Sequence, residues 1–97
     1  MRNGEYTRYH ENGELRIYSY YVNDNLHGEY KSYYSNGQLA VHANYDHGKE
    51  DGEYKRYRMN GQLFIHSHYV NGKEVHDYLA DGPLSEEELT MLVLIHA

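Results

Sequence analysis

Four side chains have types and a spacing that could hold a metal ion: His42, His66, His68 and Glu53. His66 and His68 are two residues apart, so on a β-strand both imidazoles would project from one face, about 7 Å apart. Two imidazoles and one carboxylate can coordinate Zn²⁺ and leave one position open. The alternative is that histidine replaces tyrosine as a flat, amphipathic sheet residue, since Tyr18 stands at the repeat position of His42. We favour this alternative and expect no metal ion there.

The sequence carries no recognisable catalytic constellation. It has no cysteine, and no serine stands in a pattern that supplies both a base and a group to orient that base. Phosphate-binding loops, dinucleotide-binding fingerprints and the His-Glu-x-x-His zinc motif are missing as well. We therefore expect a protein that is not an enzyme and needs no cofactor.

Three near-copies of one 24-residue unit must position these side chains. Repeat 1 spans residues 4–27, repeat 2 spans 28–51 and repeat 3 spans 52–75. The three copies share Gly, Glu, Tyr, a second Tyr, Asn, Gly, Leu and a third Tyr at the same places. A fixed period of this length predicts an architecture in which each unit packs on its neighbour.

Each repeat contains one Asn-Gly pair, at residues 12–13, 36–37 and 60–61. Asn-Gly between alternating segments favours a type I′ β-hairpin turn, in which both central residues have positive φ. Longer links, around residues 23–26, 47–51 and 71–74, would join one hairpin to the next. The sequence thus predicts an all-β fold, an antiparallel meander of three hairpin repeats with about six strands.

The predicted turns fix which residues lie opposite one another. Two-residue turns would place Tyr57 opposite Phe64 and Glu53 opposite His68. They would also place Gly28 opposite Tyr45, so that an aromatic ring covers a cross-strand glycine.

Alternation divides the strands between two faces. Face A keeps its residue types from repeat to repeat and is the expected core; it holds Leu15, Leu39, Leu63, Ile17, Val41, Ile65, Tyr21, Tyr45 and Tyr69. Face B varies between repeats, as a specific binding surface would. The residues that we expect to contact a partner there are Tyr9, Tyr18, Tyr20, Tyr33, His42, Tyr57, Phe64, His66 and His68.

The C-terminal part departs from the repeat. Residues 76–84 form a degenerate fourth repeat, expected to be a shortened strand and a turn. Ser85 and Glu88 make a capping box that predicts a helix over residues 85–97, which would cap the last hairpin. The second half of this helix is apolar all round, which favours contact with a second copy or a partner. The residues expected to make that contact are Met91, Leu92, Leu94 and Ile95.

The repeats resemble the MORN-type repeat, and in particular its variant in bacterial YwqK-type antitoxin proteins. The pattern is carried in repeat 2 by Gly28, Tyr30, Tyr33, Asn36, Gly37, Leu39, Tyr45, Gly48, Lys49 and Gly52. In repeat 1, Asp24 replaces the glycine of the link. The resemblance implies hairpin repeats and suggests neutralisation of a toxin by direct binding.

The composition limits the number of domains, the kind of partner and the cellular location that we expect. The 97 residues form one domain, and the formal net charge of −6 disfavours nucleic acid and anionic membranes as partners. The lack of cysteine and of an apolar leader fits a cytoplasmic location. We expect a non-enzymatic module that neutralises or sequesters a partner protein, with a homodimer as a further option. The alternatives are a structural or oligomerisation scaffold and a small-ligand or metal-binding domain that uses the His/Tyr face.

Overall fold

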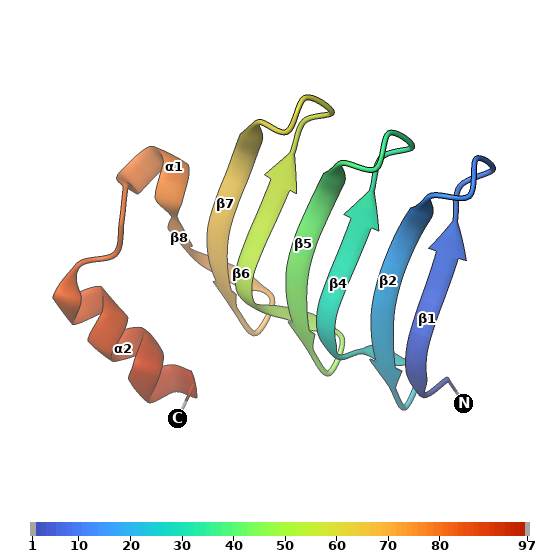
Figure 1. Ribbon diagram of the computed structural model, residues 1–97. Coiled ribbons are helices and arrows are strands. Elements are labelled where there is room, and N and C mark those ends of the chain that lie inside the picture. The colour runs from blue at the N-terminus through green and yellow to red at the C-terminus, as the bar shows by residue number, and fades with distance from the viewer. Residues whose placement is uncertain (1, 97) are drawn as a thin grey trace.

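The computed structural model describes residues 2–96 and confirms the all-β repeat fold with a C-terminal helix. One antiparallel sheet of eight strands has the order β1-β2-β4-β5-β6-β7-β8, and the short β3 pairs with β2 (Figure 1). The strands are β1 (Gly4–Tyr9), β2 (Leu15–Val22), β3 (Asn25–Leu26), β4 (Gly28–Tyr33), β5 (Leu39–Asp46), β6 (Lys49–Tyr57), β7 (Leu63–Val70) and β8 (Lys73–Asp77), and the helices are α1 (Tyr78–Asp81) and α2 (Glu86–His96). The two strands of each hairpin neighbour each other in the sheet, so sequence order and spatial order agree.

The Asn-Gly turns are not of the predicted type I′. In the first hairpin the Gly13 amide donates to the His10 carbonyl (3.0 Å) and the His10 amide donates to the Glu14 carbonyl (2.8 Å). Of the Asn-Gly pair only Gly13 has a positive φ, 89°. This is a three-residue loop, a type I turn followed by a glycine bulge. The Asn12 side chain favours it, because Oδ1 accepts the Glu14 amide at 3.0 Å.

The links between repeats, which we expected to be longer, are the two-residue turns of the fold. Both central residues have positive φ in the first link (Asn23 51°, Asp24 69°) and in the second (His47 52°, Gly48 88°). Positive φ at both positions is the requirement of a type I′ turn. The two kinds of turn are therefore exchanged relative to the prediction.

The three-residue loop changes the register near each Asn-Gly turn. Tyr57 pairs with Leu63, because a bulge follows Arg56, so the predicted pairing of Tyr57 with Phe64 is wrong. Beyond the bulge the predicted register holds, and Glu53 lies opposite His68.

Gly28 lies opposite Tyr45, as predicted, but the reason for the glycine differs. Its φ is 86°, and a Cβ added there would meet no atom within 4 Å. No ring therefore occupies the space that a side chain would enter. Glycine is favoured because side chains rarely adopt such a backbone conformation.

Two series of hydrogen bonds join successive repeats. At the Asn-Gly edge, Asn12 Nδ2 donates to the Ser35 carbonyl (2.8 Å) and Asn36 Nδ2 donates to the Met59 carbonyl (3.2 Å). At the opposite edge, the second and third link turns each donate an amide to the chain at the preceding link, Gly48 to the Leu26 carbonyl and Gly72 to the Glu50 carbonyl, both at 2.8 Å. These bonds explain why the Asn-Gly pair and the link turns recur at a fixed period.

The core lies on face A and is thin. Its buried side chains are small: Ala43 has no exposed surface, and Ser19 and Ser67 occupy the same place in repeats 1 and 3. Pairs of tyrosine rings pack edge to face over them, with the Tyr30 and Tyr45 centroids 6.1 Å apart. Burial, with a smaller contribution from Glu50, raises the pKa of Tyr45 to about 12.

The fourth repeat leaves the pattern at β8. Ala43 and Tyr45 of β5 pair with Tyr54 and Glu50 of β6, so a step of two residues lies opposite a step of four. The equivalent Ser67 and Tyr69 of β7 pair with Asp77 and Glu74 of β8, so the same step lies opposite a step of only three. The missing residue shifts the strand by one, which moves its side chains to the other face. Asp77 then caps α1 by accepting the amides of Leu79 (3.0 Å) and Ala80 (3.1 Å). The expected strand and turn after residue 77 are thus replaced by a helical turn.

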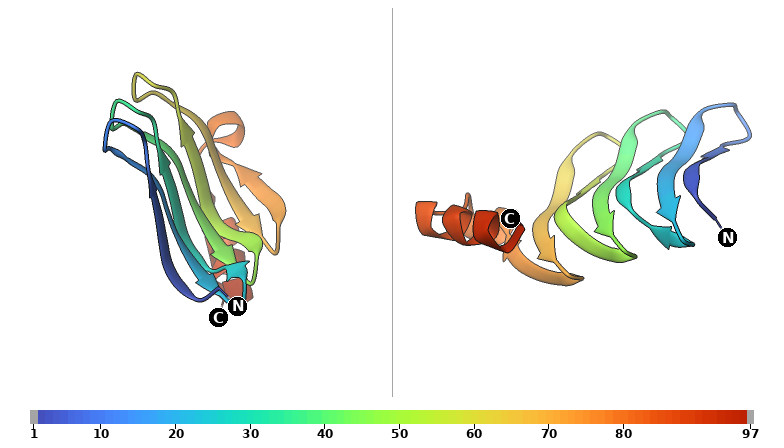
Figure 2. Two further views of the ribbon diagram at one scale, coloured as in Figure 1. Left: turned by 90° about the vertical axis from the view of Figure 1, so that its right-hand side faces the viewer. Right: turned by 90° about the horizontal axis from the view of Figure 1, so that it is seen from below.

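α2 matches the predicted helix and its capping box. The Ser85 amide donates to Glu88 Oε1 (3.0 Å), and the Glu88 amide donates to Ser85 Oγ (3.2 Å). Figure 2 shows that α2 lies beyond the β8 edge of the sheet instead of crossing one of its faces. No helix within residues 2–96 is long and apolar enough to span a membrane.

Candidate functional site

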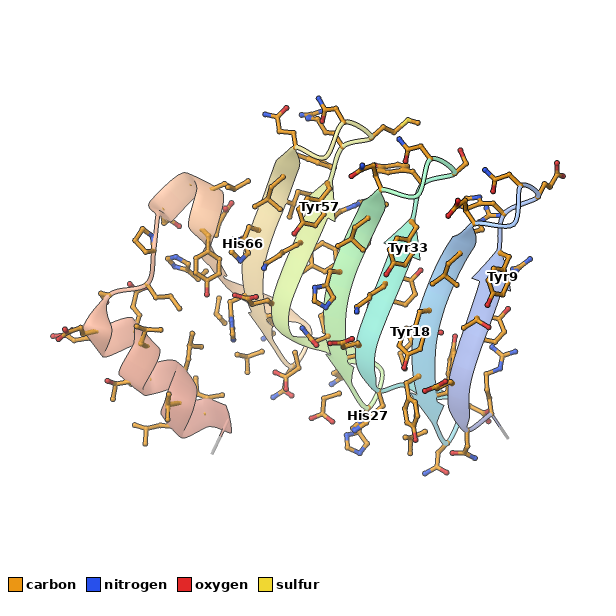
Figure 3. The ribbon with its side chains drawn as sticks, viewed as in Figure 1. Tyr9, Tyr18, His27, Tyr33, Tyr57 and His66 are labelled. Carbon is orange, nitrogen blue, oxygen red and sulfur yellow. The ribbon has the colours of Figure 1, made fainter. Side chains whose placement is uncertain are left out.

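A row of tyrosines crosses the sheet beside the Asn-Gly turns. Tyr9, Tyr33 and Tyr57 occupy equivalent places on β1, β4 and β6 (Figure 3). The preceding repeat contacts the backbone of Tyr33 and Tyr57, since His10 Nε2 donates to the Tyr33 carbonyl (2.8 Å) and the Tyr34 hydroxyl donates to the Tyr57 carbonyl (2.7 Å). Tyr9 is 62% exposed, whereas Tyr33 and Tyr57 are half-buried. The row is thus most accessible at the N-terminal edge.

A second row on face B pairs each varying side chain with an acidic residue. Tyr18 donates its hydroxyl hydrogen to Glu5 (3.5 Å), and His42 Nε2 lies 3.9 Å from Glu29. In the third repeat, His66 Nε2 lies 3.5 Å from Glu53. The varying row therefore meets the glutamate that is identical in all three repeats.

Lysine completes this arrangement in repeats 2 and 3. Lys31 Nζ lies 3.3 Å from Glu29, and Lys55 Nζ lies 3.4 Å from Glu53. Burial by itself would raise the pKa of Glu53, but Lys55 and His66 together lower it below its ordinary value. Face B thus presents compensated charges between flat rings.

The C-terminal segment covers part of face B in repeat 3. The Tyr78 ring stacks on His66, with centroids 4.2 Å apart and planes inclined by 24°. Burial raises the pKa of the Tyr78 phenol, and Glu53 and Glu88 raise it further. His66 therefore lies under Tyr78 instead of facing solvent.

His68 lies in a hollow between the sheet and the C-terminal segment. This hollow has a volume of about 340 Å³ and is lined by Glu53, His68, Tyr78, Leu84, Leu89, Leu92 and Val93. The candidate metal ligands His66 and His68 are thus packed against separate groups, and His66 Nε2 lies 3.5 Å from Glu53. The structure does not bring His42, His66 and His68 together into one cluster of metal-ligating atoms.

The remaining predicted contact residues differ in accessibility. Tyr20 is 40% exposed on β2. Phe64 is half-buried under the Arg58 guanidinium, which lies 4.8 Å from the ring centroid.

The apolar residues of α2 form a separate exposed group. Met91, Leu94 and Ile95 are 59%, 67% and 51% exposed, whereas Leu92 is half-buried. A groove of about 290 Å³ separates α2 from β8 and is lined by Val75, His76, Leu84, Glu87, Glu88, Met91, Leu92 and Ile95. His76 spans this groove, with Nε2 donating to the Gly82 carbonyl (2.7 Å) and Nδ1 3.5 Å from Glu88.

Reasoning from the sequence missed Tyr78, which stacks on His66, and a cluster of His27, Asp46 and His47. A signal for Tyr78 was present, because Asp77 and Gly82 bracket a short segment as helix caps do. The cluster depends on how neighbouring links stack, which the repeat period alone does not specify.

Comparison with protein families gives three matches to one family described as the MORN repeat variant, at residues 2–23, 26–47 and 50–71. The matches recur every 24 residues, in step with the hairpins. Comparison with curated proteins and with solved structures finds no significant match.

Proposed function

Because this chain belongs to the MORN repeat variant family, we propose that it is a non-enzymatic protein-binding module that neutralises or sequesters a partner protein, as the YwqK-type antitoxins that its repeats resemble would do. The observation that carries the proposal is a single-layer sheet with more exposed surface than a compact domain has. Fold alone does not define function, so the surface itself must be considered.

The sheet has no second layer. The molecule measures 46 × 36 × 15 Å, and its radius of gyration is 14.9 Å, against about 12.5 Å for a compact domain of this length. Its accessible surface is 6564 Å², whereas a globular protein of this mass exposes about 5,800 Å². The difference is comparable to what one partner of a standard interface buries, about 800 Å².

Face B over repeats 1 and 2 is the surface best suited to a partner. It offers Tyr9 and Tyr20 as exposed aromatic rings, with Tyr18, Tyr33 and His42 half-buried between them. Tyrosine gives a large contact area at a low entropic cost, and aromatic anchors dominate the energy of protein interfaces. The strands that carry these residues are joined by the sheet and by the hydrogen bonds between repeats, so their backbone needs little reordering on binding. The net charge of −6 favours a partner with a basic surface.

The test is affinity capture from host lysate followed by reconstitution with the captured protein. We expect a stoichiometric complex with the wild type and with Lys73→Ala, an exposed change at the opposite edge. We expect binding at least tenfold weaker in the double variant Tyr9→Ala/Tyr20→Ala, since the two lost aromatic anchors together cost more than about 1.4 kcal/mol. Both tyrosines are exposed, so circular dichroism should show an unchanged fold.

Two results would contradict the proposal. If the wild type forms no stoichiometric complex with any protein, the binding function is wrong. If the complex forms and the double variant retains full affinity, face B of repeats 1 and 2 is not the contact surface.

A second candidate function, self-association, is favoured by α2. Its exposed Met91, Val93 and Leu94 form an apolar surface, and surfaces of this kind mark contacts with other chains. Sedimentation of the wild type should then show a dimer, and Met91→Ser/Leu94→Ser should yield a monomer. A wild type that remains monomeric as its concentration rises would exclude this role.

A further inference from the structure

Three side chains with metal-ligating atoms meet at the edge of the sheet opposite the Asn-Gly turns. Within residues 2–96, one such group lies close enough to share an ion: the donor atoms of His27, Asp46 and His47 are all within 4.8 Å of one another. His27 Nδ1 lies 3.5 Å from Asp46 Oδ1, and His47 Nδ1 lies 2.5 Å from the same oxygen. One carboxylate oxygen is thus shared between two imidazoles.

The stacking of neighbouring link turns brings this group together. His27 ends repeat 1, whereas Asp46 is the last residue of β5 in repeat 2 and His47 is the first residue of the two-residue turn that follows it. The hydrogen bond from the Gly48 amide to the Leu26 carbonyl (2.8 Å) fixes one link against the other. The two histidine rings meet edge to face with centroids 5.2 Å apart.

The donor set and its spacing suit a tetrahedral ion. Ligand atoms at about 2.0–2.1 Å from Zn²⁺ lie roughly 3.3–3.4 Å apart in a tetrahedral site. The 3.5 Å between His27 Nδ1 and Asp46 Oδ1 already fits. Because Nδ1 has one lone pair, the ion would displace the His47 amide, which donates to this nitrogen across 3.4 Å. His47 must move outward by about 0.8 Å to reach this spacing, and its side chain is free to do so because it is 79% exposed.

Comparing the second link with the first shows whether the turn itself requires a histidine at position 27. In the second link the His47 amide donates to His27 Nδ1 (3.4 Å), and in the first link the Asn23 amide donates to Asn3 Oδ1 (2.8 Å). Asparagine thus accepts this amide as well as histidine does, so the turn does not require an imidazole at position 27.

The other two ligand positions lead to the same conclusion. Valine takes the place of Asp46 in the first and third links, as Val22 and Val70, and asparagine takes the place of His47, as Asn23 and Asn71. Both asparagines have a φ of 51°, close to the 52° of His47. The fold can thus form this turn without an imidazole or a carboxylate, so the second link carries metal-ligating groups that its backbone does not require.

We propose that His27, Asp46 and His47 bind one Zn²⁺ ion, which joins the links of successive repeats, with water at the remaining position. Imidazole nitrogen and carboxylate oxygen are usual zinc donors. In a chain without cysteine and with a thin core, such an ion would tie repeat 1 to repeat 2 at the edge where the turns stack.

The experiment is calorimetric titration of the full chain with ZnCl₂, together with NMR of the histidine ring nitrogens to identify the ligands. We expect one ion per chain, with ring signals of His27 and His47 shifting on saturation. The matched variant is His27→Asn/His47→Asn, which gives the second link the residues of the first. It should bind Zn²⁺ at least tenfold more weakly while its amide spectrum remains that of the folded wild type.

A second readout does not depend on that double variant. Saturating Zn²⁺ should raise the Tm of the wild type and leave the Tm of Asp46→Val unchanged. The proposal is overturned if the wild type does not bind Zn²⁺, if His27→Asn/His47→Asn binds it as tightly, or if the ring signals that shift are those of His42, His66 and His68.

Discussion

Asn36 provides the sharpest test of how the repeats hold together. Its Oδ1 accepts the Gln38 amide at 2.9 Å within its own turn, and its Nδ2 donates to the Met59 carbonyl of the next repeat at 3.2 Å. Asn60 makes the same contact within its turn, accepting the Gln62 amide at 2.9 Å, but no further Asn-Gly turn follows it within residues 2–96. The two asparagines therefore differ by the bond between repeats.

The perturbation is Asn36→Asp, with Asn60→Asp as its matched control. Aspartate keeps the oxygen that accepts the turn amide and replaces the Nδ2 donor by a second oxygen. In Asn36→Asp this oxygen faces a carbonyl 3.2 Å away, so the hydrogen bond is lost and two acceptors oppose each other. A hydrogen bond contributes about 0.5–1.5 kcal/mol net. We expect Asn36→Asp to lower the free energy of unfolding by about 1 kcal/mol more than Asn60→Asp.

Urea denaturation of both variants measures this difference. For a domain of this size, 1 kcal/mol corresponds to a fall in Tm of about 4–8 °C, so thermal unfolding provides an independent check. The m-values should be equal, because the surface exposed on unfolding does not change. Equal losses of stability in the two variants would show that the side-chain bond between repeats contributes nothing, and the stacking would then depend on strand pairing alone.

Three further predictions address the backbone, the core and the C-terminal segment. Gly28→Ala should lower the free energy of unfolding by about 1 kcal/mol, measured by urea denaturation. D-alanine at position 28 should restore stability, because the penalty comes from a φ of 86° and not from a clash. Equal losses of stability with L-alanine and D-alanine would refute this. Because the pKa of Tyr45 is raised to about 12, the contribution of this phenol to stability is complete below pH 10 and is lost as the pH rises towards 12. The phenolate absorbance should contain a component that titrates near pH 12, and Tyr45→Phe should reduce this component; an unchanged titration would contradict the assignment. Tyr78→Ala should remove the stacking on His66 and lower the free energy of unfolding by about 1 kcal/mol. Tyr78→Phe and the exposed control Leu79→Ala should leave stability nearly unchanged. Amide hydrogen exchange along α1 should become faster in Tyr78→Ala, and unchanged exchange would mean that the stacking does not hold this segment on the sheet.

Face B was predictable in outline, but its accessible extent was not. Alternation along the strands places Tyr18, His42 and His66 on one face, and each meets a glutamate there. Sequence reasoning could not show that Tyr78 lies over His66. The repeat aligns Tyr78 with the core tyrosine Tyr54, and the single residue missing from β8 moves it to the opposite face.

The amino-acid sequence by itself determined the period, the hairpins and the capped helix. These features depend on neighbours in the chain: a glycine that permits positive φ, alternation along a strand, and Ser85 within reach of Glu88. The tertiary structure decided which turn type each loop adopts and which residues of different repeats meet. Asn12-Gly13 and His47-Gly48 both contain a glycine with positive φ, yet only the second forms a two-residue turn, because the length of each loop is set by the pairing of its flanking strands. The meeting of His27 with Asp46 and His47 has the same origin, since it depends on how one link stacks on the next and not on any local preference.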